Sequence, residues 1–499
     1  FYYSAYDAPQ GDTLTGTDRN QRLMLHRLGT PQGQDELILA RPDEPDWGFH
    51  AHITEDDRYL LVSVWKGTAR MNQVWVRELG SRGPFTELVN DFRASFNVLG
   101  NDGDTLYLIT DEDAPLGKII TWNVRTGEQQ TLIPEGADKI DFAALVKDGI
   151  LLVTLKDASH RVTLYDRQGQ KKRDIPLPAL GSVLSLATHQ DDAEVFLAFT
   201  SYLFPTTPYR LHLPDGDLEA LEQPAINLDV NDFEVTQEFA TSRDGTRVPH
   251  FIVSRRGLKR DGTNRTLLYG YGGFNISLTP TFSPSILGWL DRGGVYVAAN
   301  LRGGGEYGKE WHAAGTLGRK QNVFDDFVAV AEHLIGTGVT SPAHLGIQGR
   351  SNGGLLVGAA MTQRPDLFAA AIPQVGVLDM LRYHEFTIGW AWASDYGRSD
   401  DPGMFEALHA YSPVHNLREG VTYPATLVTT GDHDDRVVPA HSYKFISELQ
   451  RVQQGDSAGQ ERPTIIRIQV NTGHGAGKPT ALLIEEWADV WAFLETYLE

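Results

Sequence analysis

The sequence of 499 residues contains no cysteine. Disulfide bonds, a cysteine nucleophile and thiolate metal ligands are therefore excluded, although a disulfide-free protein is tolerated in any compartment. The chain also has no apolar run of about 18 residues, which is what a membrane-spanning helix needs, and no signal-peptide pattern. Its histidines show no H-E-x-x-H or comparable spacing, so we expect no metal.

Basic residues are scarce: 44 Lys and Arg stand against 65 Asp and Glu, a formal net charge of −21. An acidic surface repels nucleic acid and anionic membranes, so we expect neither as a partner. The apolar fraction of 41% and the charged fraction of 22% are those of a soluble globular protein with ample core. The length predicts two or three domains.

The chain begins at Phe1 without an initiator Met, in what reads as the middle of a strand. We therefore expect missing N-terminal residues, and any targeting signal would be missing with them. The compartment stays open between the cytoplasm, which we favour, and a bacterial periplasm.

Residues 1–220 read as strand after strand, and one pattern repeats within them. Two acidic or polar residues precede an apolar strand at Asp56–Val64, Asp102–Thr110, Lys147–Thr154 and Asp191–Phe199. The copies are about 45 residues apart, as are the blades of a β-propeller, although an irregular stack of meanders is an alternative. Only four to five blades fit, so we interpret this region as a partial propeller domain.

Residues 221–499 alternate strands with helices. Phe233–Ser242 and Arg247–Ser254 predict an opening hairpin, and buried strands follow at Thr266–Gly270 and Val295–Asn300. Helical spacing of apolar residues runs from Val323 to Ile335. This alternation predicts a mostly parallel sheet covered on both faces, as in an α/β-hydrolase domain.

Within this second region, Gly349–Gly354 reads G-R-S-N-G-G between a short apolar strand and a helix. Strand, G-x-S-x-G and helix form the context of a nucleophile elbow, in which a strained turn presents the serine, here Ser351, above the end of a sheet. Flanking glycines are needed because strand and helix approach too closely for a Cβ. We weigh this against a plain Gly-rich turn.

A serine nucleophile needs a base and an acid that orients it, in the chain order Ser, acid, His in this fold. His474 follows a predicted strand in a Gly-rich loop and suits the base. The acid is ambiguous by chemistry alone, because Asp432, Asp434 and Asp435 all lie in one loop after another strand.

Five segments together closely resemble the prolyl oligopeptidase family: Leu268–Ser277, Asn300–Gly308, Ser351–Gly354, Asp432–Pro439 and Gly473–Pro479. The match is dense from about residue 230 onward and thinner before residue 220. The resemblance implies a seven-bladed propeller that caps an α/β-hydrolase domain. It also implies endopeptidase action after proline on short peptides, by a monomer that needs no cofactor.

The resemblance assigns roles to individual residues. Ser351 would be the nucleophile, His474 the base and Asp434 the acid, the last by resemblance only. The oxyanion would be held by the Asn352 backbone N–H and the Tyr271 hydroxyl, and a phenol in a dry pocket is a sound donor there.

The resemblance also implies a pocket for the proline ring. That ring is apolar and its nitrogen carries no hydrogen, so an aromatic site without donors suits it. Trp392 matches the family's stacking tryptophan, Arg436 matches the residue that holds a peptide carbonyl or carboxylate, and the other pocket walls would be Phe274, Val377, Tyr396 and Val437.

Two positions depart from the family's pattern. Arg350 stands where many relatives have glycine, and Trp65 stands where the family has an arginine that binds substrate carbonyls. Arg350 is the free position of the elbow and does not count against activity, and Trp65 bears only on contacts with the extended substrate. Two alternatives are kept separately: an oligopeptidase that prefers basic residues, which would want acidic pocket walls, and a catalytically impaired propeller that binds a partner.

Overall fold

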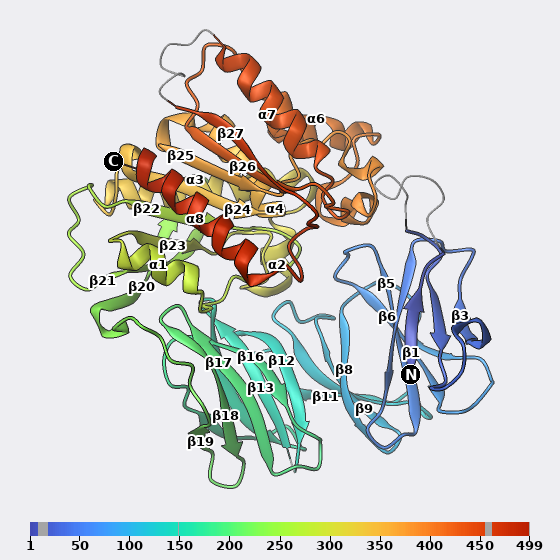
Figure 1. The fold of residues 1–499 in the computed structure, drawn as a ribbon. Coiled ribbons are helices and arrows are strands. Elements are labelled where there is room, and N and C mark those ends of the chain that lie inside the picture. Colours follow the sequence, from blue (N-terminus) through green and yellow to red (C-terminus); the bar gives the residue numbers. More distant parts are fainter. Residues whose placement is uncertain (8–17, 148, 455–461, 499) are drawn as a thin grey trace.

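The structure is a computed structural model that describes residues 1–7, 18–147, 149–454 and 462–498. Asp148, in the third copy of the repeat, lies outside the described residues. Five small antiparallel sheets form an arc in Figure 1, and an α/β part lies above them. Among the described residues, no helix is both long and apolar enough to cross a membrane.

The small sheets follow one another along the chain, and each strand pairs with its neighbour in sequence. Within the described ranges, the first has three strands and the other four have four. Their strands are β1 (Tyr2–Ala5), β2 (Arg22–Leu25), β3 (Glu36–Ala40); β4 (Trp47–Ile53), β5 (Tyr59–Lys66), β6 (Asn72–Glu78), β7 (Thr86–Val89); β8 (Phe96–Asp102), β9 (Thr105–Thr110), β10 (Lys118–Asn123), β11 (Gln129–Ile133); β12 (Lys139–Val146), β13 (Gly149–Lys156), β14 (Ser159–Asp166), β15 (Lys171–Ile175); β16 (Ser182–Ala187), β17 (Glu194–Ser201), β18 (Phe204–His212) and β19 (Asp217–Ala220).

The predicted repeat is confirmed by these sheets. Each of its four copies forms the second strand of a four-stranded sheet, namely β5, β9, β13 and β17. Apolar side chains of neighbouring sheets pack into small separate cores; one of them joins Leu61 and Val76 to Leu106 and Leu108. Successive sheets that pack face to face in this way are propeller blades.

The α/β part is built on one eight-stranded sheet with the order β20-β21-β23-β22-β24-β25-β26-β27. The antiparallel hairpin of β20 and β21 forms one edge, and the strands from β23 onward run parallel. The strands are β20 (Phe233–Thr241), β21 (Arg247–Arg255), β22 (Thr266–Gly270), β23 (Val295–Ala299), β24 (Leu345–Arg350), β25 (Ala370–Gln374), β26 (Ala425–Gly431) and β27 (Thr464–Gln469).

Helices cover both faces of this sheet, as predicted. One large core includes residues of α3, α4, α6 and α7, and a second core on the other face includes residues of α1 and α8. The helices are α1 (Pro284–Asp291), α2 (Gly308–Ala313), α3 (Gln321–Gly336), α4 (Asn352–Gln363), α5 (Ala393–Tyr396), α6 (Pro402–Tyr411), α7 (Ala440–Gln453) and α8 (Thr480–Tyr497). The sequence analysis did not predict α1, α2, α5 or α6.

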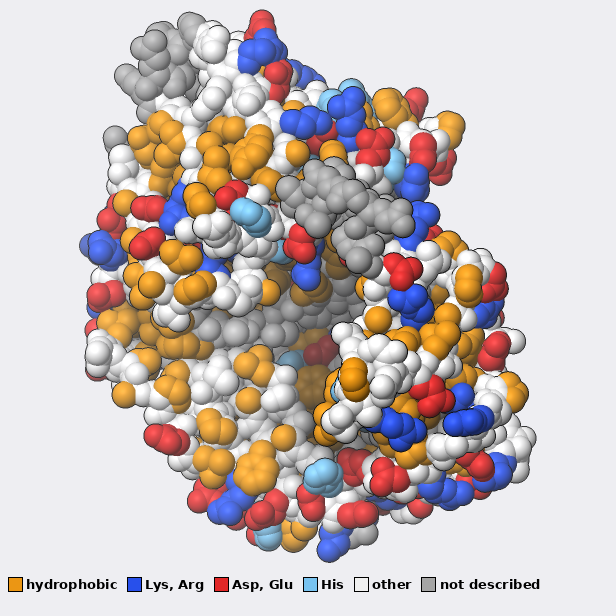
Figure 2. Space-filling model, turned by 45° about the vertical axis from the view of Figure 1, so that its right-hand side comes forward, with side chains coloured by type: hydrophobic (Ala, Val, Ile, Leu, Met, Phe, Trp, Pro, Cys, Tyr) orange, Lys and Arg blue, Asp and Glu red, His pale blue; other side chains and the backbone are white. Residues whose placement is uncertain are grey.

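Hydrogen bonds tie the small sheets to the α/β part at several points. The Ser182 hydroxyl donates to the Pro280 carbonyl at 2.7 Å, and the Tyr307 hydroxyl donates to Asp157 at 2.7 Å. The face shown in Figure 2 is hollowed, with acidic and basic side chains interspersed around the hollow.

Candidate active site

Ser351 lies in the tight turn between β24 and α4. Its φ of 58° and ψ of −118° are strained for a residue with a side chain. A Cβ on Gly349 would come within 2.2 Å of the Gly353 carbonyl oxygen, and one on Gly353 within 2.7 Å of that of Gly270. Both glycines are therefore required by the close approach of strand and helix, and the turn has the geometry of a nucleophile elbow.

Asp434 and His474 meet at the same edge of the sheet, in the loops that follow β26 and β27. The Asp434 Oδ2 atom is 2.7 Å from His474 Nδ1. Its Oδ1 atom accepts backbone N–H groups of Arg436 at 3.0 Å and Val437 at 2.9 Å. The carboxylate is fully buried, and these bonds fix its direction. Because Nδ1 faces the carboxylate, Nε2 is the nitrogen left to act on another group.

The neighbouring acids are placed differently. Asp435 is exposed, and Asp432 pairs with His433, whose Nδ1 lies 2.7 Å from Asp432 Oδ1. Of the three candidate acids, Asp434 is the one whose carboxylate contacts His474.

Arg350 joins the serine turn to the loop that carries His474. Its Nη2 atom lies 3.5 Å from the His474 carbonyl oxygen, and its Nη1 atom donates to Glu486 at 3.1 Å. Lys478 reaches the other Glu486 oxygen at 2.5 Å. Burial raises the pKa of Glu486, but these two cations outweigh it and keep that pKa below its usual value. Arg350 thus helps to hold the histidine loop against the turn.

Tyr271 and Asn352 flank Ser351. Burial, with the charges of Tyr269 and Asp395, raises the pKa of Tyr271 to about 12, and a hydrogen bond with Ser351 opposes that rise. Tyr271 is therefore a neutral donor at physiological pH. Asn352 is the first residue of α4, and the first N–H groups of a helix have no partner within it. Two N–H or O–H donors are thus available beside the serine.

The predicted pocket residues belong to one apolar cluster. Trp392, Tyr396, Val377 and Val437 are all buried in the same core, and Phe274 packs against it. The rings of Phe274 and Tyr396 meet edge to face, 5.3 Å apart. The structure therefore places all five in or against one core, and it brings Phe274 and Tyr396 into direct contact.

Arg436 is the charged member of the predicted set. It is exposed, and its charge opposes the rise in the pKa of Tyr271 that burial causes. Trp392, for its part, stacks on Tyr383 with centroids 6.1 Å apart and an angle of 10° between the rings.

Lys320 was missed by the sequence analysis. Its buried Nζ donates to the Gly272 carbonyl at 2.8 Å and to Asn352 Oδ1 at 3.2 Å. Burial lowers the pKa of Lys320 to about 8, and the Asp395 charge opposes this. The Tyr396 hydroxyl donates to the same Asn352 oxygen at 2.7 Å. These contacts hold the Asn352 side chain, and nothing in the sequence around Lys320 marks it as part of a site.

The propeller touches the pocket through the turn after β5. Thr68 donates its N–H to the Ala391 carbonyl at 2.9 Å, and its hydroxyl lies 3.1 Å from that of Ser394. Trp65, at the end of β5, packs its ring against Gly48, where a Cβ would come within 1.9 Å of it. The blade is therefore coupled to the segment that carries Trp392.

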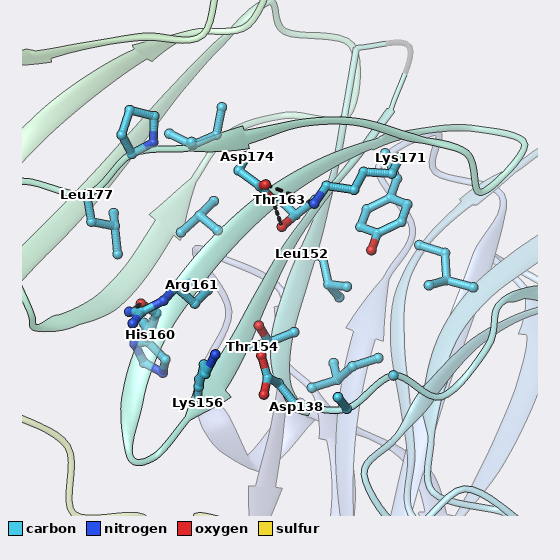
Figure 3. A pocket seen from close by; sticks show the side chains of 18 of the residues that line it. Asp138, Leu152, Thr154, Lys156, His160, Arg161, Thr163, Lys171, Asp174 and Leu177 are labelled. Atoms are coloured by element: carbon cyan, nitrogen blue, oxygen red, sulfur yellow. Dashed lines mark hydrogen bonds and ion pairs between the residues drawn. The ribbon is translucent and has the colours of Figure 1, made fainter.

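A separate cavity of about 710 Å³ lies on the small sheets (Figure 3). Side chains of β13, β14 and β15 line it, and Asp174 accepts hydrogen bonds from Thr163 and Lys171 at 2.9 and 2.8 Å. None of the predicted site residues lines it, so this cavity is distinct from the site around Ser351.

Comparisons with known proteins agree with this architecture. Residues 1–224 match the family described as prolyl oligopeptidase, N-terminal beta-propeller domain, and residues 280–499 match the prolyl oligopeptidase family. The chain is 44% identical to a prolyl endopeptidase of Elizabethkingia meningoseptica over 99% of its own length and 70% of that protein's. It is 35% identical to a prolyl endopeptidase of Dictyostelium discoideum, over 100% of its own length and 69% of that protein's.

Solved structures are equally similar. One, from a study of two prolyl endopeptidases, has a TM-score of 0.93 and 39% identity, and the match covers 100% of this chain and 73% of that one. Prolyl oligopeptidase B from Galerina marginata, bound to a 25mer macrocyclization substrate, has a TM-score of 0.94 and 35% identity. That match covers 100% of this chain and 70% of the other. The chain belongs to the prolyl oligopeptidase family.

Proposed function

We propose that this chain is a serine peptidase that hydrolyses short peptides on the carboxyl side of proline. The observation that carries the proposal is the buried Asp434 carboxylate, 2.7 Å from His474 Nδ1, on the loops beside the strained Ser351 turn. The five predicted pocket walls support the choice of proline, because each is an apolar or aromatic side chain of one core.

The chemistry follows from the roles of these groups. Ser351 Oγ attacks the carbonyl carbon of the proline residue while His474 Nε2 takes the hydroxyl proton. The Tyr271 hydroxyl and the Asn352 N–H donate to the oxygen as it becomes negative. The C–N bond then breaks as His474 returns the proton to the leaving amine, and an acyl-enzyme forms. Water, deprotonated by His474, releases the acid in the reverse sequence of steps.

The other groups position the substrate. Trp392 stacks on the proline ring, and Phe274, Val377, Tyr396 and Val437 enclose it. Arg436 holds a main-chain carbonyl or terminal carboxylate of the substrate. Residues 1–220 form the propeller domain and residues 221–499 the hydrolase domain, and the enzyme works as a monomer on peptides rather than on nucleic acid or membranes.

The propeller restricts substrates to short peptides, because it covers the side of the hydrolase domain that carries Ala391 and Ser394. Entry then requires the two domains to part or a blade seam to open. A ten-residue peptide with one internal proline should be cleaved far faster than a large folded protein, and equal rates would contradict this restriction.

The direct test uses blocked Gly-Pro, Gly-Arg and Gly-Phe amides with a fluorescent leaving group, with Ser351→Ala in parallel. Rapid turnover of Gly-Pro that the alanine variant abolishes is the expected result. Cleavage of the Gly-Arg amide alone would support Ser351 as the nucleophile but would contradict the proposed proline pocket. No turnover of any of the three would favour a binding protein.

A further inference from the structure

A cluster of three metal-ligating side chains lies away from Ser351, at the edge of the large sheet. Glu238 on β20, His250 on β21 and His333 on α3 each bring one ligand atom within 4.8 Å of the others. Glu238 and His250 are directly opposite each other in the antiparallel pair, and α3 packs against both strands. The expectation of no metal relied on spacing along the sequence, which does not reveal a cluster of this kind.

His250 is the member that needs an explanation. It lies between Val248 and Ile252 on the face of β21 that packs on α3, and its side chain is fully buried. Among the residues that the structure describes, none makes a hydrogen bond of normal geometry to either of its ring nitrogens. Buried polar groups are normally paired, so an unpaired imidazole aimed at two other ligands points to an absent partner.

The other two members make the cluster accessible. His333 Nε2 lies 3.0 Å from Glu238 Oε2, and the two side chains are 26% and 24% exposed. The His250 and His333 rings are 5.1 Å apart. An ion could thus enter from solvent, and a water molecule could complete its coordination.

We propose that Glu238, His250 and His333 form a structural binding site for a divalent transition-metal ion of the zinc type. Two imidazoles and one carboxylate are donors that zinc prefers, and a tetrahedral ion needs ligand atoms about 3.3 Å apart. The three atoms lie within 4.8 Å of one another, so binding of the ion requires the side chains to rotate closer together.

Arg260 occupies part of this site when no ion is bound. Its guanidinium pairs with Glu238, and its side chain is 39% exposed. The ion therefore competes with Arg260 for the carboxylate, and Arg260 can swing into solvent when the ion binds. The bound ion ties the hairpin of β20 and β21 to the last turn of α3.

To test the site, the full chain is first freed of metal by a chelator and is then titrated with cobalt(II). We expect one equivalent to bind with the visible absorption of a four-coordinate ion, and zinc to displace it and raise the melting midpoint. His333→Gln and Glu238→Gln should each weaken binding at least tenfold, whereas Arg260→Gln should strengthen it several-fold.

Two controls separate this site from other histidines. His212→Gln changes an exposed histidine that also pairs with a carboxylate, and His474→Gln removes the candidate catalytic imidazole. Both variants should bind cobalt as the unmodified chain does. Absence of stoichiometric binding, unchanged affinity in His333→Gln and Glu238→Gln, or no gain in Arg260→Gln would each overturn the proposal.

Discussion

The small sheets and the eight-stranded sheet bury their apolar residues in different ways. Neighbouring blades share small cores, each limited to two adjacent sheets, such as the one between β12–β15 and β16–β19. The large sheet has one extensive core on each face. The first arrangement is a modular series of contacts between neighbours, whereas the second is a single continuous body.

This difference in packing explains why the candidate catalytic residues lie at the edge of the large sheet rather than in the blades. A continuous body holds loops from distant parts of the chain at one edge, and Ser351, Asp434 and His474 lie on three such loops. Among the described residues, the blades supply none of these three, and the turn of Thr68 contacts Ala391 of the α/β part instead. Changes at the sheet edge should therefore alter catalysis, whereas changes in the blades should alter substrate access.

The largest effect is expected for Asp434→Asn. The amide cannot hold His474 in the tautomer that accepts the serine proton, so kcat should fall about 10³- to 10⁴-fold. Asp435→Asn is the matched control, because its carboxylate is exposed and its loss should change kcat less than about twofold. Steady-state kinetics on the Gly-Pro amide measure both, and equal losses would contradict the assignment of the acid.

Tyr271→Phe should have the next largest effect. Loss of one donor to the developing oxyanion lowers kcat about 10²- to 10³-fold while KM changes little. A rise in KM at constant kcat would instead place Tyr271 in ground-state binding.

At the junction of the two regions, the buried carboxyl group of Glu306 should make the free energy of unfolding depend on pH. It is buried, its Oε1 accepts from Leu278 N at 2.9 Å, and its Oε2 has no hydrogen-bond partner among the described residues. Burial raises its pKa from 4.5 to about 7. Between these pH values the folded protein binds the proton more tightly than the unfolded chain does, so stability falls as pH rises through that window.

Glu306→Gln should therefore stabilise the protein by up to about 3 kcal/mol at pH 8 and by little at pH 4.5. Denaturant unfolding at the two pH values measures the difference. An equal gain in the free energy of unfolding at both pH values would show that the charge of Glu306 is not the cause of the effect.

The smallest effect concerns the pocket. Trp392→Ala should lower kcat/KM for the Gly-Pro amide about 10- to 100-fold, because the proline ring loses its stacking surface. Trp390→Ala, in the same turn, lies beside Arg19 rather than in the proposed pocket and should change kcat/KM less than about threefold. Equal losses in the two variants would argue for a general disturbance of the turn.

Much of this fold could be predicted from the sequence because its signals are local. The alternation of strands and helices, the repeat of the blades and the G-x-S-x-G turn all depend on residues close together in the chain. The choice of Asp434 over Asp435 could not be made by chemistry alone, because it depends on which carboxylate the turn points inward. The helix α1 begins at a proline within a short apolar stretch and gave no clear periodicity.

Contacts between distant segments could not be predicted. Lys320 reaches Asn352 only after α3 and α4 have packed, and His250 meets His333 only when α3 covers the hairpin. Neither pair has a motif, since each depends on tertiary packing rather than on spacing. The role of Arg350 likewise needs Glu486 of α8, 136 positions away.

The most direct test of the central claim is covalent labelling of the serine. A fluorophosphonate reacts with a serine that a neighbouring base activates, and peptide mass spectrometry identifies the residue. We predict one adduct per chain, on Ser351, formed far more slowly in His474→Gln. No adduct, an adduct on another serine, or equal rates in the two proteins would contradict Ser351 as a nucleophile activated by His474.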